Sequence, residues 1–449
     1  MSGTITDLQA LMLSADPEAD LRAAYRTRFA AARAEPRLAR PPGPLRVLLA
    51  GYSGACNTGA DLRTGEIIRQ LRDAFGSGGI ALGIITVGDH PLPDWGTVTT
   101  ERIEGFPPDA VRDLCARYDA VVVCEGSLFT STFSDGLATM LTAFLGMAAA
   151  MGKPAIAYGA EADRMSPAVE QFVAETAREA LVIARNRASL ERLEALGLQA
   201  ELGTDTGWSF ADAGMAAAQA LLRERGWDGH APLTVVCPTD PFRWPLIADP
   251  ERAMFASLTG DVAPEHHSGM MFFQPAETSQ DLCSAFLDGI ATALHEHDRR
   301  SAEPRFTIVV GMEANDQDAC LELAQRLGAP APVVAGTTGP HAIVGILRSA
   351  SLLVSARYHA VLLSMAAAVP AIGLAYDQRV RALFAEAGHP GLALEARAPG
   401  LAERLSAGLR LLAAEPDAGA DFAAFAAAQR AVQRAAGERV AAYLRGSAD

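Results

Sequence analysis

The chain of 449 residues is half hydrophobic and one-fifth charged, which predicts a folded globular protein of two α/β domains plus extensions. The formal net charge of −15 argues against broad binding to nucleic acid or anionic membranes, and an anionic ligand would need a local positive pocket. The six cysteines form no C-x-x-C pair, so we expect reduced thiols in a cytoplasmic protein and no metal or disulfide framework.

The N-terminal segment, residues 1–44, is expected to be a helical extension. It lacks a basic segment that leads into an apolar one, so no signal peptide is expected. Residues 16–34 have helical spacing with Asp16 or Asp20 as the N-cap, and the proline-rich run at 41–44 ends the helix. A docking helix and a regulatory arm are both open for this extension.

A strand and a glycine-rich turn follow. The strand at residues 45–51 leads through a turn that contains Asn57 and Gly59 into a helix at 63–75. Glycines in a strand-to-helix turn allow a ligand to approach the backbone closely. The turn is neither a Walker loop nor a G-x-G-x-x-G motif, so its spacing alone is a weak signal of function.

The remaining strands of this half are expected at residues 84–87, 120–124, 155–159 and 180–184. Polar residues follow two of them: Glu125 and Ser127 after the second, and Arg185 after the last. Glu125 suits a base or a hydrogen-bond acceptor for a hydroxyl group, and structural pairing with an arginine is the alternative. The apolar stretch 137–151 falls short of the ~20 residues that span a bilayer, so we expect a buried helix.

A second α/β half begins after a linker at residues 226–232. Its expected elements are strands at 233–237, 305–310 and 332–335, helices at 279–298 and 342–349, and a final alanine-rich helix at 419–444. The loop 238–245 combines arginine and aromatic side chains, which suits stacking on a ligand ring or a packed rim. His266 and His267 are adjacent and lack the spacing of a metal site.

The stretch 351–377 carries the clearest functional signal. Buried strands at its two ends flank a helix at about residues 360–368, which is the pattern of a βαβ unit. The residues between the first strand and the helix are Ser355, Arg357, Tyr358 and His359. A helix start attracts anions, an arginine adds a forked charge, and a histidine exchanges a proton near neutral pH. Because ligands of open α/β sheets bind at the carboxyl ends of strands, we predict an anion site with a proton donor; capping of a buried helix start is the alternative.

The segment S-A-R-Y-H-A followed by A-V-P-A-I-G-L-A-Y-D, ending at Asp377, resembles the C-terminal signature of the polysaccharide pyruvyltransferase family. The turn at residues 51–59 resembles the opening G-Y-x-G-x-x-N-x-G of the same family. Arg185 also matches a family position. Four positions depart from the family pattern. Ala60 stands where an acid is expected, with Asp61 one place late; Cys124 and Glu125 replace two glycines; and Asn186 replaces an acid.

The resemblance implies an α/β fold of two facing Rossmann-like domains, similar to the GT-B architecture. With it we predict a helical extension at 1–44, a first domain at 45–228, a second domain with the anion site at 229–415, and a C-terminal helix at 416–449.

The resemblance also implies transfer of pyruvate from phosphoenolpyruvate to two hydroxyl groups of a sugar or glycan, giving a ketal. Phosphoenolpyruvate is then the donor substrate, with no cofactor and no metal. His359 is expected to be the general acid and Glu125, ahead of Asp61 or Asp377, the base. The expected substrate-binding residues are Arg357, Arg185, Tyr358, Ser355, Asn57, Gly59, Ser127 and Asp377.

One geometric condition applies to this site. Residues two apart on a regular helix do not share a face, so Arg357 and His359 converge only if the turn extends through Tyr358 or the helix starts nearly at His359.

Two rival functions are kept. A nucleotide-sugar glycosyltransferase with a GT-B fold would hold a base in the loop at 242–244, and a non-catalytic ligand-binding relative would explain the divergent positions. No transmembrane segment or nucleic-acid partner is expected, and a homo-oligomer is open.

Overall fold

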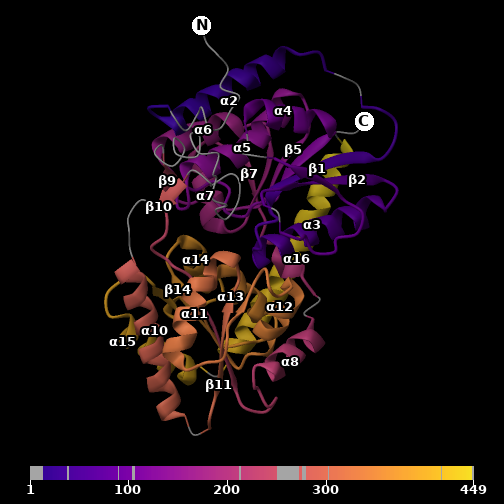
Figure 1. Ribbon diagram of the computed structural model, residues 1–449. Helices are drawn as coiled ribbons and strands as arrows, with labels where there is room; N and C mark the ends of the chain where they lie inside the picture. The colour runs from indigo at the N-terminus through magenta and orange to yellow at the C-terminus, as the bar shows by residue number, and fades with distance from the viewer. Residues whose placement is uncertain are drawn as a thin grey trace, which may run out of the picture.

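The computed structural model describes residues 14–37, 40–88, 90–103, 107–211, 214–249, 273–275, 280–301, 303–415 and 417–446. The chain folds into two lobes, each built on a parallel β-sheet with helices on its faces, and the two lobes face each other (Figure 1). The predicted fold class, two facing Rossmann-like domains with a GT-B-like arrangement, is confirmed. The carboxyl ends of both sheets point toward the junction of the lobes, so the residues that follow these strands can share one site.

The first lobe holds a seven-stranded parallel sheet in the order β3-β2-β1-β4-β5-β6-β7. Its strands are β1 (Leu45–Ser53), β2 (Ile80–Thr86), β3 (Thr99–Arg102), β4 (Ala120–Val123), β5 (Ala155–Ala160), β6 (Leu181–Ala184) and β7 (Ala200–Leu202). Its helices are α3 (Thr58–Phe75), α4 (Pro108–Arg117), α5 (Asp135–Ala150), α6 (Pro167–Thr176) and α7 (Arg187–Ala195). The strand order reverses between β1 and β4, and such a switch point opens a crevice at the carboxyl ends of the strands.

The second lobe holds a six-stranded parallel sheet in the order β12-β11-β8-β13-β14-β15. Its strands are β8 (Leu233–Cys237), β11 (Phe306–Gly311), β12 (Val333–Val334), β13 (Leu352–Ser355), β14 (Ala371–Ala375) and β15 (Ala393–Glu395). Its helices are α8 (Met215–Glu224), α10 (Gln280–Arg300), α11 (Gln317–Leu327), α12 (Pro340–Ser349), α13 (Tyr358–Met365), α14 (Gln378–Glu386) and α15 (Leu401–Ala414). Short 3-10 helices are η1 (Thr206–Ser209), η3 (Ala314–Asp316) and η4 (Pro390–Leu392). The order reverses between β8 and β13, so a second switch point faces the first.

The position of helix α8 does not agree with the predicted domain boundary at residue 229. We expected it within the first domain, but it packs against α12 of the second lobe. Its buried residues Ala218 and Leu222 belong to the same apolar cluster as Leu233 of β8. The chain therefore passes from one lobe to the other before α8, because its short apolar stripe is buried by the second lobe.

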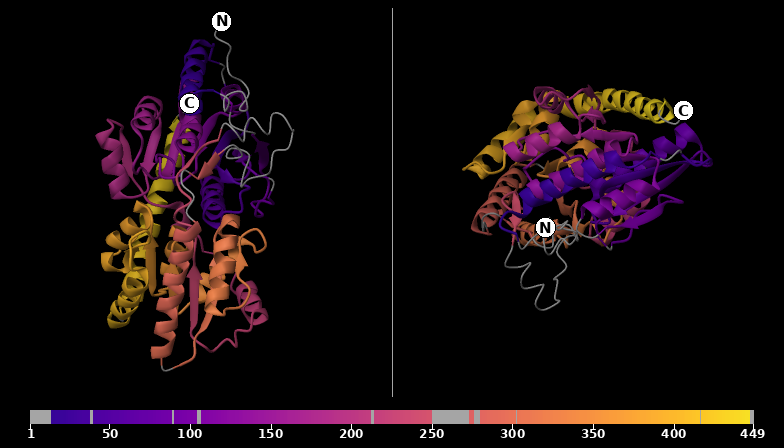
Figure 2. Two further views of the ribbon diagram at one scale, coloured as in Figure 1. Left: turned by 60° about the vertical axis from the view of Figure 1, so that its left-hand side comes forward. Right: turned by 90° about the horizontal axis from the view of Figure 1, so that it is seen from above.

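Two segments run back from the second lobe to the first. Strand β9 (Leu246–Ala248) pairs with β10 (Phe273–Pro275), and the Leu246 N–H donates to the Phe133 carbonyl of the first lobe at 2.7 Å. Helix α16 (Ala418–Gly446) starts on the second lobe and ends on the first (Figures 1 and 2). Its residue Phe422 is part of the second-lobe core, and Val440 and Leu444 pack beneath β1. These two segments tie the lobes together around their shared junction.

The N-terminal extension docks on the first lobe. Helix α2 (Pro17–Ala34) packs against α5, and the predicted cap Asp16 accepts a hydrogen bond from the Ala19 N–H at 3.0 Å. The Phe29 ring stacks on Tyr25 and packs at a tilt against Phe172 of α6. Of the two possibilities for the extension, the structure therefore shows a helix docked on the first lobe. Residues 1–13, His266 and His267 lie outside the described residues. Helix α5 is the predicted buried apolar helix, and no helix in the described part of the chain is long and apolar enough to cross a membrane.

Candidate active site

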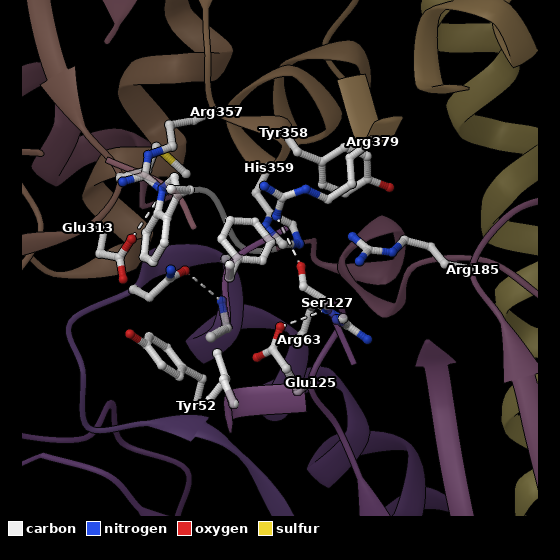
Figure 3. A pocket seen from close by; sticks show the side chains of 18 residues that line it. Tyr52, Arg63, Glu125, Ser127, Arg185, Glu313, Arg357, Tyr358, His359 and Arg379 are labelled. Carbon is white, nitrogen blue, oxygen red and sulfur yellow. Dashed lines mark hydrogen bonds and ion pairs between the residues drawn. The ribbon is translucent and has the colours of Figure 1, made fainter. Parts of the chain in front are cut away.

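A cavity that is partly open to solvent lies between the lobes. Its lining residues lie at the carboxyl ends of strands of the two sheets or in the loops and helices that follow them (Figure 3). The first lobe contributes Tyr52, Asn57, Gly59, Ala60, Arg63, Glu125, Gly126, Ser127, Phe133, Leu137 and Arg185. The second lobe contributes Trp244, Met312, Glu313, Arg357, Tyr358, His359 and Arg379. The cavity therefore depends on both lobes.

The turn between β1 and α3 is clamped to the second lobe by backbone hydrogen bonds. The Thr58 N–H donates to the Met312 carbonyl at 2.8 Å, and the Ala314 N–H donates to the Cys56 carbonyl at 3.2 Å. Asn57 caps α3 by accepting from the Ala60 N–H at 3.1 Å. The start of α3 is thus held at a fixed distance from the second lobe.

Gly59 allows His359 to approach the start of α3. A Cβ atom at Gly59 would lie 2.1 Å from Nδ1 of His359, far inside any real contact. Helix α13 begins at Tyr358, and Arg357 is its N-cap with an extended backbone (φ −99°, ψ 117°). Because Arg357 precedes the first helical turn, it and His359 both line the cavity although they are two residues apart.

Asp205 lies beside His359. Its Oδ2 lies 3.5 Å from Nε2 of the imidazole, and its Oδ1 accepts from the Gly207 N–H at 2.8 Å. Burial lowers the pKa of His359 below its ordinary value, with Asp205 opposing this effect. Burial alone would raise the pKa of Asp205, but Arg63, His359 and Arg185 lower it below its ordinary value. The pair is therefore an ionised carboxylate beside a mainly neutral imidazole that can hold and pass a proton.

Arg63 and Arg185 share the same carboxylate oxygen. Arg63 Nε and Arg185 Nη1 lie 3.5 and 3.4 Å from Oδ2 of Asp205. Arg63 also donates to the carbonyls of residues 158 and 159, each at 3.0 Å. A Cβ atom at Gly126 would lie 1.9 Å from Nη1 of Arg63 and 2.7 Å from Nη2 of Arg185. Only a residue without a side chain at this position lets both guanidinium groups reach the cavity wall.

Arg379 connects the lobes at the same end of the cavity. It is paired with Asp377 (Nε to Oδ2, 2.9 Å) and donates through Nη1 to Oγ of Ser127 at 3.2 Å. Its guanidinium carbon lies 4.8 Å from the centre of the Phe133 ring. Arg379 thus joins α14 of the second lobe to the loop that follows β4 of the first.

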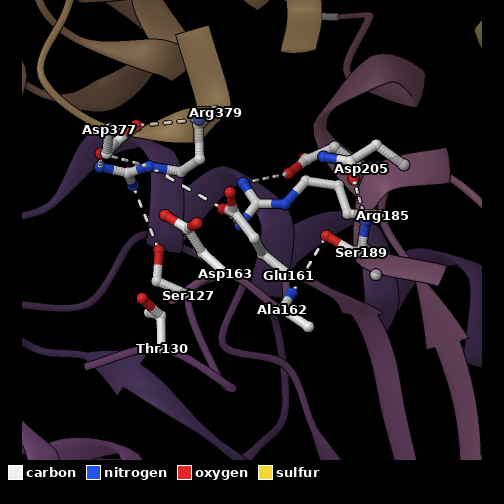
Figure 4. A network of polar contacts seen from close by, with 12 residues as sticks. Ser127, Thr130, Glu161, Ala162, Asp163, Arg185, Ser189, Asp205, Asp377 and Arg379 are labelled. Carbon is white, nitrogen blue, oxygen red and sulfur yellow. Dashed lines mark hydrogen bonds and ion pairs between the residues drawn. The ribbon is translucent and has the colours of Figure 1, made fainter. Parts of the chain in front are cut away.

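Glu161 lies behind this end of the cavity, between two arginines (Figure 4). Its Oε2 lies 2.9 Å from Arg185 Nη2 and 3.9 Å from Arg379 Nε, and its Oε1 has no hydrogen-bond partner among the described residues. Burial raises the pKa of Glu161 to about 7, although Arg185 and Arg379 oppose this effect. Near neutral pH this carboxyl group therefore neutralises the arginines only in part.

Arg357 on the other wall is held by two carboxylates. Its Nε lies 2.9 Å from Oδ2 of Asp316, its Nη2 also contacts Asp316, and its Nη1 lies 3.0 Å from Oε2 of Glu313. Burial raises the pKa of Asp316, and Arg357 opposes this effect. Of the five N–H groups of the guanidinium, one on each terminal nitrogen lies outside these pairs.

The structure brings most of the predicted site residues to the cavity wall. Those that line it are Asn57, Gly59, Glu125, Ser127, Arg185, Arg357, Tyr358 and His359. Ser355 and Asp377 lie behind the wall: the Ser355 hydroxyl accepts from the Arg357 N–H at 2.9 Å, and Asp377 is the N-cap of α14. Glu125 accepts from the Ser127 N–H at 2.8 Å.

The divergent positions have local roles. Ala60 lines the cavity where an acid is expected, and Asp61 lines a different cleft beside α3. Cys124 is buried with its thiol near the Thr64 hydroxyl. Asn186 is the N-cap of α7 and accepts from the Ser189 N–H at 2.8 Å.

Sequence reasoning missed several residues that the fold brings to this site. They are Tyr52, Arg63, Phe133, Glu161, Glu313 and Arg379. Trp244 belongs to the loop that was predicted either to stack on a ligand ring or to form a packed rim, and it lines the cavity. From the sequence, Asp205 could either face the cleft or form a turn. In the structure it accepts from the Gly207 N–H within a turn, and it also lies 3.5 Å from His359. For Arg379 the sequence did contain a signal. It is a basic residue two positions after Asp377, at the start of a helix that follows a central strand, and such a helix start points into the crevice.

Two facing Rossmann-like domains with a cavity at the carboxyl ends of both sheets define a protein of the GT-B-like class. Within this class the model of the family "Polysaccharide pyruvyl transferase" matches residues 57–378. The chain belongs to that family.

Solved structures share the fold at low identity. UDP-GlcNAc 2-epimerase from Neisseria meningitidis, bound to UDP-GlcNAc, is 9% identical with a TM-score of 0.51, covering 90% of this chain and 100% of its own. The UDP-N-acetylglucosamine 2-epimerase from Rickettsia bellii is 9% identical with a TM-score of 0.53 and coverages of 90% and 97%. A putative UDP-N-acetylglucosamine 2-epimerase from Listeria monocytogenes is 11% identical with a TM-score of 0.52 and coverages of 85% and 91%. No curated protein matches the chain.

Proposed function

We propose that this protein transfers pyruvate from phosphoenolpyruvate to two hydroxyl groups of a sugar or glycan, forming a ketal and releasing phosphate. The observation that carries the proposal is the convergence of Arg63, Arg185, Arg379 and His359 at one end of the interlobe cavity. Phosphoenolpyruvate is a small anion with a carboxylate and a phosphate, and forked guanidinium groups suit both. Membership of the pyruvyl transferase family supports the same reaction.

The charges at this end favour an anionic donor. Three guanidinium groups and His359 are set against Asp205, Asp377 and Glu161. Because the pKa of Glu161 is raised to about 7, part of the opposing charge is removed at neutral pH. The start of α13 adds the positive end of a helix dipole beside His359. A dianionic donor therefore meets a local positive field in a protein whose net charge is −15.

The proposed chemistry starts with a proton. His359 protonates the methylene carbon of the donor, and the adjacent C2 becomes electrophilic. The first sugar hydroxyl bonds to C2 and loses its proton to Glu125. The bond between C2 and the phosphate oxygen then breaks, and phosphate leaves with the electron pair and the proton held by Glu125. The second hydroxyl bonds to C2 and returns its proton to His359, which restores the starting state.

Proton uptake should accompany donor binding. In the empty cavity burial lowers the pKa of His359, so the imidazole is mainly neutral near pH 7. A negatively charged donor next to it favours the imidazolium form, because an opposite charge within a few ångströms raises the pKa of a base. The donor thus supplies the charge that loads its own general acid.

Arg357, the other predicted donor ligand, lies at the opposite end of the cavity from these groups (Figure 3). Its charge is largely offset by Asp316 and Glu313, so it contributes less to donor affinity than Arg185. Replacement of Arg185 by alanine should weaken donor binding more than the same replacement of Arg357. Equal losses would contradict this ranking.

The test is calorimetry with phosphoenolpyruvate beside a panel of nucleotide sugars, in two buffers with different ionisation enthalpies. We expect phosphoenolpyruvate to bind with proton uptake and nucleotide sugars not to bind. His359→Ala should retain part of the donor affinity, lose the proton uptake that His359 supplies, and abolish phosphate release with sugar acceptors. Binding of a nucleotide sugar without phosphoenolpyruvate would favour a glycosyltransferase, and donor binding without phosphate release with any acceptor would favour a non-catalytic relative.

A further inference from the structure

The two ends of the cavity differ in chemistry. The end described above carries Arg63, Arg185, Arg379 and His359, whereas Tyr52, Glu313 and Arg357 lie at the opposite end (Figure 3). Trp244 lines the same cavity. We propose that this second end is the acceptor subsite, where a neutral sugar ring stacks on the indole of Trp244 and directs its hydroxyls to Glu125 and Glu313. The inference rests on the proposed function, in which the first end holds the donor.

Trp244 is a half-buried aromatic surface held in place from both lobes. Its ring packs edge to face with Phe133 of the first lobe, with ring centres 5.0 Å apart and planes at 84°. Arg397 of the second lobe donates through Nε to the Pro241 carbonyl at 2.9 Å and through Nη2 to the Trp244 carbonyl at 3.3 Å. An ordered indole loses little entropy when a ring stacks on it, and the negative face of the indole suits the C–H groups of a pyranose.

Glu125 lies where the two ends meet. Its Oε1 is fixed by the Ser127 N–H at 2.8 Å, and the Ser127 hydroxyl accepts from Arg379 Nη1 at 3.2 Å. This chain of hydrogen bonds ties the carboxylate to an arginine of the donor end. A sugar hydroxyl that donates to Glu125 is therefore presented beside the donor, as attack on C2 requires.

The charge at the acceptor end disfavours anions. Glu313 and Asp316 pair with Arg357, Glu125 lines the same cavity, and the charge of Arg243 lowers the pKa of the nearby Tyr52 hydroxyl, against the larger effect of burial. Three carboxylates against two guanidinium groups leave this end without the positive excess of the donor end. The donor is thereby directed to the arginines, and an acceptor ring that carries a carboxylate or phosphate is rejected. The chemical class that fits is a neutral hexopyranose with two hydroxyls near each other.

The experiment compares Trp244→Ala and Trp244→Phe with the wild-type protein. Trp95→Ala is the matched control, because Trp95 is also half-buried but lines a cleft on the other side of α3. The probes are the methyl glycosides of galactose, mannose and glucose, with methyl glucuronide as the acidic counterpart. Sugar binding is followed by saturation-transfer NMR without donor, phosphoenolpyruvate binding by calorimetry, and folding by thermal denaturation.

We expect at least one neutral glycoside to bind the wild-type protein and the glucuronide not to bind. Trp244→Ala should weaken that glycoside by about tenfold with donor affinity unchanged, Trp244→Phe should restore part of the loss, and Trp95→Ala should have no effect. Absence of glycoside binding to the wild type, equal binding of the glucuronide, or parallel losses of donor and sugar affinity in Trp244→Phe would overturn the assignment. Failure of the donor to bind at all would instead contradict the proposed function, because the sugar measurement is made without donor.

Discussion

Replacement of Gly59 by alanine tests the position of His359 directly. The added Cβ would lie 2.1 Å from Nδ1, 2.5 Å from Cγ and 2.8 Å from Cε1 of the imidazole, whereas ordinary contacts begin at 3.4 Å. The ring must therefore move by about 1.3 Å, the difference between 3.4 and 2.1 Å. Helix α3 cannot retreat, because the Thr58 N–H is bonded to the Met312 carbonyl at 2.8 Å.

This displacement should separate activity from stability. Alanine within a helix is favoured over glycine by up to about 1 kcal/mol, which offsets part of the roughly 1–3 kcal/mol that displacing the packed ring costs. The free energy of unfolding of Gly59→Ala should therefore fall by no more than about 2 kcal/mol. A displacement of about 1 Å at a reacting group can cost ~10²-fold in rate, so phosphate release should fall by about that factor. The affinity for phosphoenolpyruvate should change little, because the arginines keep their contacts.

The assay joins kinetics to NMR of the histidine ring nitrogens. The His359 signal is assigned from its loss in His359→Ala, and its titration should move to lower pH in Gly59→Ala because the ring leaves Asp205. Gly78→Ala is the control, since a Cβ at Gly78 meets no atom within 4 Å. Undiminished phosphate release together with an unchanged His359 signal would refute the reasoning.

Three further predictions concern the charged groups of the donor end. Arg379→Ala should weaken phosphoenolpyruvate binding by about tenfold or more, through loss of a charge-assisted contact, whereas Arg381→Ala, on the exposed side of α14, should leave the calorimetric affinity unchanged; equal effects would contradict the role of Arg379. Asp205→Asn leaves the buried guanidinium of Arg63 without its carboxylate partner, so the free energy of urea unfolding near pH 7 should fall by about 3–5 kcal/mol. The pKa of Asp205 is lowered in the folded protein, so its stabilisation is present above the unfolded-state pKa and is lost as the pH falls through the folded pKa. A difference in unfolding free energy between the wild-type protein and Asp205→Asn that grows on acidification would contradict the assignment. The pKa of Glu161 is raised from 4.5 to about 7, so its contribution is fully present below pH 4.5 and is lost as the pH rises through 7; relative to Glu161→Gln, the wild-type protein should lose stability over this interval, and parallel pH profiles of the two proteins would refute the burial of a protonated carboxyl group.

The sequence determined the local elements and several of the groups that carry the chemistry. Apolar runs such as Leu352–Val354 and Ala120–Val123 are long enough for a buried parallel strand and too short for a helix, so their state is set by local pattern. The polar residues that follow these strands, among them Glu125, Arg357 and His359, lie at the cavity because every carboxyl end of a parallel sheet meets the same edge. These inferences need only short-range periodicity and turn chemistry.

Only the tertiary structure decided which of these groups meet. Arg63, Asp205 and His359 lie far apart along the chain, and their contact depends on the rotation of α3 and on how the two lobes dock. The pairing of Arg357 with Asp316 and the burial that raises the pKa of Glu161 arise in the same way. Helix α8 has an apolar stripe that either lobe could cover, and packing against α12 settles its place. Ion pairs and lobe contacts form between residues that are far apart in the sequence. Local sequence patterns do not specify the distances between such residues in the folded protein.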